Sequence, residues 1–240
     1  MGSLGVQEAV KTRIRIAEDL SLGDETVLGA EVSHHFTTVL RGRVGDTVGL
    51  IDASGNLYRS VVKSLTPCVV EVLEALDSGG VNAERTVVMW VPLLKSKKTD
   101  GLIRQLTELG VAEIVIYLSE RSVVRPKAEA VAKLLDRYER ISEEATRQCR
   151  RTDSVRIGFS RSLPNEDAGV FLWEERGDSV DLLWSNEPTV RRLLIGPEGG
   201  LSKDEADALI ARGWTAVCLG QRILRAETAV LAAASLAIYR

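Results

Sequence analysis

The stretch RRLLIGPEGGLSKDEADALIARG, residues 191–213, decides the fold of the C-terminal half of the chain. An apolar run at 193–195 stops at the turn GPEGG (196–200), and SKDE (202–205) then has the S-x-x-E pattern of a helix capping box. Glycine adopts backbone angles that other residues avoid, which suits a tight turn at this point. We therefore predict a strand, a glycine turn and a helix that begins near Ser202.

A glycine turn before a helix is often a phosphate cradle, and the residues here argue against one. The stretch lacks the GK[ST] of a P-loop and the G-x-G-x-x-G spacing of a dinucleotide fingerprint. Glu198 would also repel a pyrophosphate. A plain tight turn is one interpretation. If the turn holds a ligand, we expect that ligand to be neutral or positively charged near the glutamate.

A second junction, TAVCLGQRILRAETAVLAAA (215–234), repeats this order of strand, glycine, short loop and helix. The loops that follow parallel strands emerge at the same edge of a sheet, where ligands bind. Backbone groups of two such loops could bind the edge of an adenine, with Ile223 and Leu224 as apolar walls. A nearby carboxylate tolerates the sulfonium of S-adenosylmethionine, which makes that cofactor one candidate.

The pattern of the chain changes after about residue 76. The first part is rich in β-branched segments around one helix at 31–41, and 77–82 has the composition of a linker. Strand and helix patterns then alternate, which predicts a mostly parallel sheet covered by helices. We predict a small β domain at 1–77 and an α/β domain at 83–240. The expected strands are 12–16, 46–52, 57–65, 68–76, 86–94, 112–118, 155–159, 169–173 and 181–184, and the expected helices are 100–110, 127–150 and 227–240.

Composition limits the classes of function. The net charge of −3 means that any nucleic-acid binding must come from local basic patches. Cys68, Cys149 and Cys218 lie far apart, and the two histidines are adjacent, so we expect neither a disulfide framework nor a metal site. The N-terminus lacks a signal-peptide pattern, and the longest apolar stretch, 229–239, is too short to span a bilayer. We expect a cytoplasmic protein without a membrane segment.

The motif GPEGGLS followed by LGQRILRAETA resembles the RsmE family of ribosomal RNA uridine-N3 methyltransferases, in the SPOUT superfamily. The resemblance continues in HHFTTVLRGRVGD (34–46), TELGVAEIVIYLSERSV (107–123) and EEATRQCRR (143–151). The five motifs stand in the family's order and cover nearly the whole chain. Cys149 replaces a common serine, the proline usual after the last arginine is absent, and the segment 160–190 has no clear match.

The resemblance implies a SPOUT-type trefoil-knotted parallel-sheet α/β domain, preceded by a small PUA-like β-barrel that binds RNA. It implies a homodimer that uses S-adenosylmethionine to methylate N3 of a uridine in 16S ribosomal RNA, free or within the small ribosomal subunit. Two alternatives stay open: a SPOUT methyltransferase for another RNA position, such as a ribose 2′-hydroxyl of transfer RNA, and a non-catalytic RNA-binding ribosome-assembly factor.

Carried onto this chain, the resemblance assigns a methyl-donor pocket to the two glycine loops. Arg225 is the candidate cation that stabilises the uracil anion, and Glu198 is a candidate general base whose alternative role is to brace the loop. The predicted cofactor residues are Leu194, Ile195, Gly196, Pro197, Glu198, Gly199, Gly200, Leu219, Gly220, Ile223, Leu224, Arg225, Glu227 and Thr228.

Basic residues near the motifs are candidates for RNA contact. Helix C-termini favour cations, and three arginines in RQCRR exceed that need, so we predict phosphate or base contacts there. For the lysines, a solvated surface role is the alternative. The predicted RNA-binding residues are Arg41, Arg43, Lys95, Lys97, Arg121, Arg147, Arg150 and Arg151.

Overall fold

The structure is a computed structural model that describes residues 10, 12–76, 86–95, 97–149, 151–165, 168–173 and 190–239. The chain divides into two compact units, Met1–Gly80 and Val81–Arg240. The predicted linker at 77–82 and the predicted strand at 181–184 lie outside the described residues.

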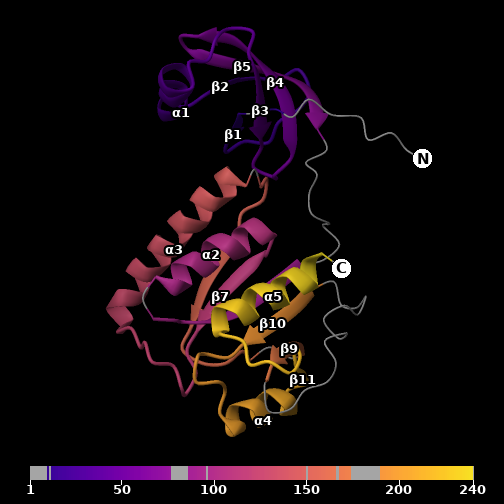
Figure 1. Cartoon of the computed structure of the whole chain (residues 1–240). Coiled ribbons are helices and arrows are strands. Elements are labelled where there is room, and N and C mark those ends of the chain that lie inside the picture. Colours follow the sequence, from indigo (N-terminus) through magenta and orange to yellow (C-terminus); the bar gives the residue numbers. More distant parts are fainter. Residues whose placement is uncertain are drawn as a thin grey trace, which may run out of the picture. The chain divides into compact units, whose positions relative to one another are not determined.

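The N-terminal unit is a five-stranded sheet with one short helical segment (Figure 1). Its strand order is β1-β3-β4-β5-β2, antiparallel except for the β1–β3 pair. The predicted helix at 31–41 is present as an α-helical turn that continues as a π-helix. The strand β2 was not predicted, because three residues are too few to show a period. The elements are β1 (Arg13–Arg15), β2 (Glu25–Val27), α1 (Ala30–His34), η1 (His35–Val39), β3 (Thr47–Ile51), β4 (Leu57–Leu65) and β5 (Cys68–Leu76).

The C-terminal unit is a six-stranded sheet in the order β11-β9-β10-β6-β7-β8. Every pair of neighbouring strands is parallel, which confirms the predicted parallel α/β domain. The elements are β6 (Thr86–Pro92), α2 (Lys98–Leu109), β7 (Glu113–Tyr117), α3 (Ala128–Gln148), β8 (Arg156–Ser160), β9 (Gly169–Leu172), β10 (Val190–Ile195), α4 (Lys203–Ala211), β11 (Trp214–Val217) and α5 (Ala226–Ile238).

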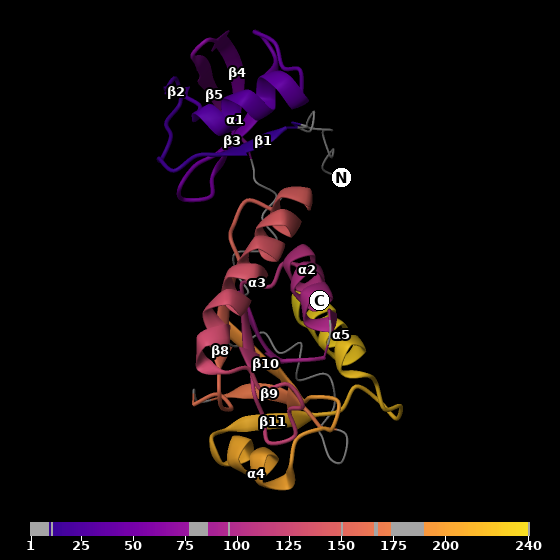
Figure 2. The same ribbon diagram turned by 90° about the vertical axis from the view of Figure 1, so that its left-hand side faces the viewer.

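Helices cover both faces of this sheet. Figures 1 and 2 show α2 between α3 and α5, with α4 apart from these three, beside β11. Alternate residues of β10 face opposite layers. Leu193 and Ile195 pack in the cluster of α2, α3 and α5, whereas Leu194 packs in the cluster of α4. The turn that follows β10 therefore leaves the sheet between two packed layers.

The helix boundaries follow from the expected local signals. Ser202 Oγ accepts a hydrogen bond from the amide of Glu205 at 3.3 Å, and Glu205 Oε2 accepts one from the amide of Ser202 at 2.9 Å. The predicted capping box is thus confirmed at the start of α4. Helix α2 ends at Gly110, whose φ of 105° is the left-handed conformation that glycine tolerates best.

Candidate functional site

A cavity of about 420 Å³ opens at the carboxyl edge of the C-terminal sheet. Its walls are two loops and the beginnings of two helices. The first loop, residues 196–201, follows β10, and the second loop, residues 218–225, follows β11. This is the edge at which parallel α/β sheets bind their ligands.

The first loop is held by hydrogen bonds from β7, which is separated from β10 by β6, and from the turn that follows β7. The hydroxyl of Tyr117 donates to the carbonyl of Ile195 at 2.8 Å, and Arg121 Nη1 donates to the carbonyl of Gly199 at 3.0 Å. Within the loop, the amide of Gly200 donates to the carbonyl of Pro197 at 2.9 Å, and Gly200 has a φ of 69°. Burial raises the pKa of Tyr117 well above its ordinary value, so the phenol stays a donor.

The capping box at α4 extends this bracing. Glu205 Oε1 accepts a hydrogen bond from the amide of Glu120 at 2.8 Å, while its other oxygen caps the helix. One carboxylate therefore fastens the segment 119–122 to the start of α4. The SER motif around Arg121 and the GPEGG turn are consequently two parts of one hydrogen-bonded structure.

The second loop is held by fewer contacts. Its described hydrogen bonds are from Cys218 Sγ to the carbonyl of Gly220, at 2.9 Å, and from the amide of Ala229 to the carbonyl of Arg225, also at 2.9 Å. Gly220 has a φ of 119°, which essentially only glycine adopts. The side chain of Ile223 is 83% exposed. The residue nevertheless lines the cavity, and its role as an apolar wall stays a prediction.

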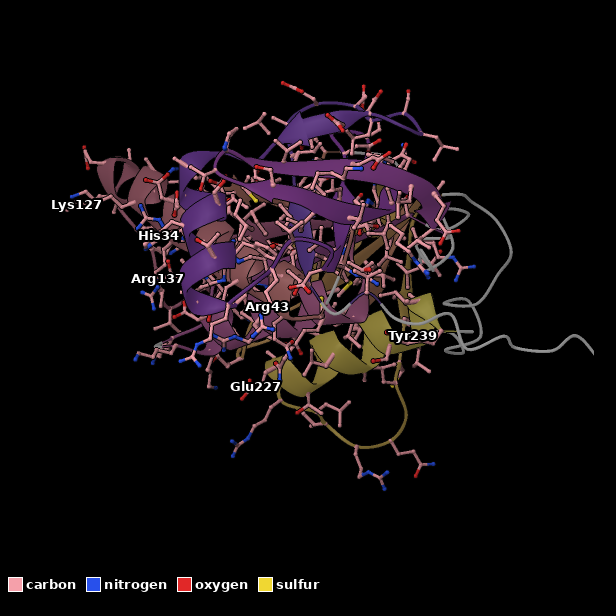
Figure 3. The ribbon with its side chains drawn as sticks, turned by 90° about the horizontal axis from the view of Figure 1, so that it is seen from above. His34, Arg43, Lys127, Arg137, Glu227 and Tyr239 are labelled. Atoms are coloured by element: carbon pink, nitrogen blue, oxygen red, sulfur yellow. The ribbon has the colours of Figure 1, made fainter. Side chains whose placement is uncertain are left out.

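A lysine joins the two sides of the cavity. Lys98 Nζ lies 3.3 Å from Glu198 Oε1 of the first loop and 3.3 Å from Glu227 Oε1 in the first turn of α5. Figure 3 shows Glu227 at the end of α5 opposite to Tyr239. Hydrogen bonds to Glu227 and Glu198 raise the pKa of Lys98. The pKa of Glu227 is lowered by its own backbone amide at the helix start and by Lys98 and Arg225.

Eleven of the fourteen predicted cofactor residues line this cavity. Three do not: Leu194 points into the α4 cluster, Gly199 lies against Arg121, and Thr228 is exposed on the first turn of α5. The eleven are Ile195, Gly196, Pro197, Glu198, Gly200, Leu219, Gly220, Ile223, Leu224, Arg225 and Glu227.

Sequence reasoning missed ten further lining residues. Several belong to the same two junctions, where proximity along the chain was the available signal. Leu172 and Trp173, at the end of β9, carried no signal that tied them to the loops. For Lys98, on α2, the available signal was its place after the C-terminal end of a strand, at the ligand-binding edge. The ten are Lys98, Leu172, Trp173, Leu201, Val217, Cys218, Gln221, Arg222, Ala226 and Ala229.

The predicted RNA-binding residues are in different environments. Arg151 has a side chain only 9% exposed, which donates to the carbonyl of Thr107 and pairs with Asp153. Its guanidinium thus braces the end of α2, and RNA contact by Arg151 stays a prediction. Arg121 is exposed and also braces the first loop. Five other predicted RNA-binding residues are also exposed: Arg41, Arg43, Lys95, Lys97 and Arg147. Arg150 lies outside the described residues.

The described part of the chain contains neither a cluster of metal ligands nor a membrane-spanning helix. No group of three or more His, Cys, Asp or Glu side chains stands close enough there to hold a metal ion. None of the helices described is long and apolar enough to cross a membrane.

The fold and the site are those of an RNA methyltransferase. A family model of the RNA methyltransferase domain matches residues 82–238, and one of the RNA methyltransferase PUA domain matches residues 28–73. The first match alone spans more than half of the chain. The protein belongs to the RNA methyltransferase family, in the branch of ribosomal RNA small subunit methyltransferase E.

Three relatives illustrate this membership. The chain is 30% identical to ribosomal RNA small subunit methyltransferase E of Synechocystis sp., over 95% of this chain and 79% of that protein. It is 28% identical to the protein of the same name from Bacillus subtilis, over 97% of this chain and 94% of that protein. The crystal structure of that methyltransferase from Neisseria gonorrhoeae, bound to S-adenosyl methionine, has a TM-score of 0.77 at 26% identity, over 93% of this chain and 95% of that one. The resemblance found in the motifs is confirmed.

Proposed function

We propose that this protein is an S-adenosylmethionine-dependent methyltransferase that methylates N3 of a uridine in 16S ribosomal RNA. One observation carries the proposal: the two glycine loops that the motifs predict meet at one cavity on the ligand-binding edge of the sheet. The solved relative from Neisseria gonorrhoeae, which covers nearly the same length, is bound to this cofactor.

The cavity suits the proposed methyl donor. Its 420 Å³ lies within the range of about 300–1,000 Å³ that is typical of small-molecule sites. Leu172, Trp173 and Leu219 offer apolar surface for an adenine, and the loops offer backbone amides and carbonyls. Glu198 and Glu227 place two carboxylates in the lining of the cavity, where negative charge favours a cationic ligand. The glutamate in the first loop is thus compatible with a sulfonium.

Methyl transfer to a uridine needs an electron pair on N3. The N3–CH₃ bond forms as the S–CH₃ bond breaks, its electrons return to sulfur, and the N3 proton leaves to solvent or to a base. We assign the stabilisation of the uracil anion to Arg225, which lines the cavity, is exposed, and has no side-chain hydrogen bond or salt bridge to another described residue. A fixed cation beside a developing negative charge lowers the barrier.

For Glu198, the contact with Lys98 favours the bracing role over that of general base. The carboxylate already accepts from an ammonium 3.3 Å away. Glu198→Gln tests this assignment, because the amide oxygen can still accept from Lys98 but cannot take a proton. A brace predicts a small loss of kcat at every pH, whereas a base predicts a large loss that grows as the pH falls.

The RNA and the second subunit are the proposed partners. We assign 1–77 to RNA binding and 83–240 to methyl transfer, with Arg41, Arg43, Lys95, Lys97 and Arg147 as phosphate contacts. The homodimer is proposed from the family resemblance, and Leu231 and Leu236 on α5 are half-buried against the core of their own unit. Light scattering tests the dimer directly: a monomeric mass at micromolar concentration would contradict it.

Two experiments test the function as a whole. Calorimetry with S-adenosylmethionine comes first, and a failure to bind would favour the RNA-binding assembly factor. Mass spectrometry of 16S ribosomal RNA then compares a deletion strain with and without the protein. Restoration of 3-methyluridine supports the proposal. Restoration of a 2′-O-methyl nucleoside instead would favour the alternative target.

A further inference from the structure

Helix α2 begins with two lysines, and the acidic residue of its first turn, Asp100, forms its ion pair with Arg137 of α3. Lys98 is its first residue and Lys97 its N-cap, and among the described residues no side chain caps this end by a hydrogen bond. The N-terminus of a helix carries partial positive charge, so a cation there is unfavourable and an anion is favoured. When a protein places a cation at a helix N-terminus, residues elsewhere in the fold usually compensate for it, and such exceptions are typical of functional sites.

The compensation comes from two carboxylates far along the chain. Glu198 and Glu227 stand 100 and 129 residues from Lys98, and both lie 3.3 Å from its ammonium. By comparison, Lys63 pairs with Glu71 alone and Arg156 with Glu113 alone among the ion pairs that these two cations form. The raised pKa of Lys98 agrees with this double contact. Three separate segments are therefore joined at one charged group.

The three groups are placed to hold the cavity rather than to stabilise the fold. Their side chains are 39%, 35% and 28% exposed, and exposed ion pairs contribute little to folding. All three residues line the cavity. Glu198 belongs to the first loop, and Glu227 follows the second loop directly. Two carboxylates that share one ammonium would repel each other without it, so Lys98 fixes the distance between the two walls.

We propose that Lys98 is a positioning residue for the methyl donor, acting through Glu198 and Glu227 to hold the two walls of the cavity at the separation that the donor needs. This inference rests on the proposed function, which supplies the donor. The positioning role also has an electrostatic consequence. The three groups carry a net charge of −1, and removing Lys98 leaves −2. Removing Lys98 should therefore weaken the binding of S-adenosylmethionine, which is cationic at sulfur, less than the binding of S-adenosylhomocysteine, which is neutral there.

The test compares donor and product binding by calorimetry in Lys98→Met, Lys98→Arg and wild type. We expect Lys98→Met to bind S-adenosylmethionine about three- to tenfold more weakly, the scale of two partly exposed ion pairs, and S-adenosylhomocysteine more weakly still. Lys98→Arg should bind the donor within about threefold of wild type, because a guanidinium also bridges carboxylates. Lys63→Met is the matched control, since Lys63 forms an ion pair with Glu71 in the other unit.

The outcomes separate the two proposals. If the wild type binds no donor, the proposed function fails. If the wild type binds and Lys98→Met binds donor and product as well as wild type does, the positioning proposal alone fails. An equal loss for both ligands would contradict the electrostatic part. If Lys98→Met does not fold, Lys98→Arg still decides, because a loss of binding there contradicts the bridging role.

A double-mutant cycle distinguishes positioning from direct contact. If Lys98 acts through the carboxylates, Lys98→Met should have little further effect on donor affinity in a Glu198→Gln/Glu227→Gln background. An undiminished effect in that background would mean that Lys98 touches the donor itself, and the proposal would be overturned.

Discussion

The two loops that enclose the cavity follow the same pattern in sequence but are held in different ways. The first loop is fixed by Tyr117, Arg121 and the capping box at α4. The second loop has one described hydrogen bond from a side chain, that of Cys218, and three consecutive exposed residues, 221–223. The fold alone sets the shape of the first wall. The second wall has fewer such supports.

This difference suggests a division of work within the site. A braced loop with a buried support offers a constant backbone surface for the donor. A loop with exposed arginines and few internal contacts is free to meet a large substrate such as RNA. The following predictions test that division in order of decreasing effect.

Arg225→Ala should lower kcat by about 10²- to 10³-fold, the usual loss when one group that stabilises a developing anion is removed. Donor affinity should change much less. Single-turnover methylation of a 16S fragment measures the first quantity, and calorimetry the second. Arg104→Ala, at an exposed position on α2 without a described salt bridge, is the control. A larger loss in Glu198→Gln than in Arg225→Ala would move the chemistry to the first loop.

Alanine substitutions of the two glycines with positive φ in these loops, Gly200 and Gly220, should differ in whether they reduce stability or donor affinity more. Gly200→Ala should destabilise the protein by about 1–2 kcal/mol, because the braced loop cannot relax from its left-handed conformation. Gly220→Ala should cost less global stability, although its φ is less accessible, and should weaken donor binding more. Urea denaturation and calorimetry measure the pair. A greater loss of stability in Gly220→Ala would show that the second loop is equally fixed.

Ser202→Ala removes the helix cap next to the first loop and should cost about 1 kcal/mol. For a chain of this length the Tm should fall by about 2–4 °C in a thermal melt. Gln221→Ala, in the second loop, should leave the Tm unchanged within error, because Gln221 is exposed. Equal shifts in the two variants would remove the contrast between the loops.

The smallest expected effect is a pH dependence of the Tm caused by Glu227, which follows the second loop directly. The pKa of Glu227 is lowered from its ordinary value of 4.5, so its charged form stabilises the folded state above that pH. This contribution is lost as the pH falls through the lowered pKa. The Tm difference between wild type and Glu227→Gln should therefore shrink between pH 7 and pH 3, and Glu139→Gln, on the exposed face of α3, is the control. A difference that grows on acidification would contradict the ion pair.

Much of the fold could be predicted because its signals are local. Gly110 and the Ser202 capping box ended or began helices where expected. Strand β10 shows the limit of such signals. Leu193, Leu194 and Ile195 form one apolar run because a parallel strand is buried on both faces. The run has no alternation to show which residue faces the cavity, and the side chain of Leu194, a predicted cofactor residue, packs in the cluster of α4.

The parts of the site that escaped prediction depend on contacts between distant segments. Nothing near Lys98 in sequence indicates that its partners are at 198 and 227. Arg151 was grouped with its neighbours as a basic cluster, but the carbonyl of Thr107, 44 residues away, receives its guanidinium. Charge clusters in sequence show which residues are available, and only the fold decides how each is used.

Cys218 also makes the cavity accessible to chemical footprinting. Its thiol lies in the cavity wall and is partly exposed, whereas Cys68 is buried and Cys149 is partly exposed outside the cavity. A maleimide titrated against the native protein should therefore modify two thiols, and a bound donor should protect only one of them. Cys149 then serves as the internal reference, so that occupancy of the wild-type site can be followed by intact mass without an added dye or a substitution.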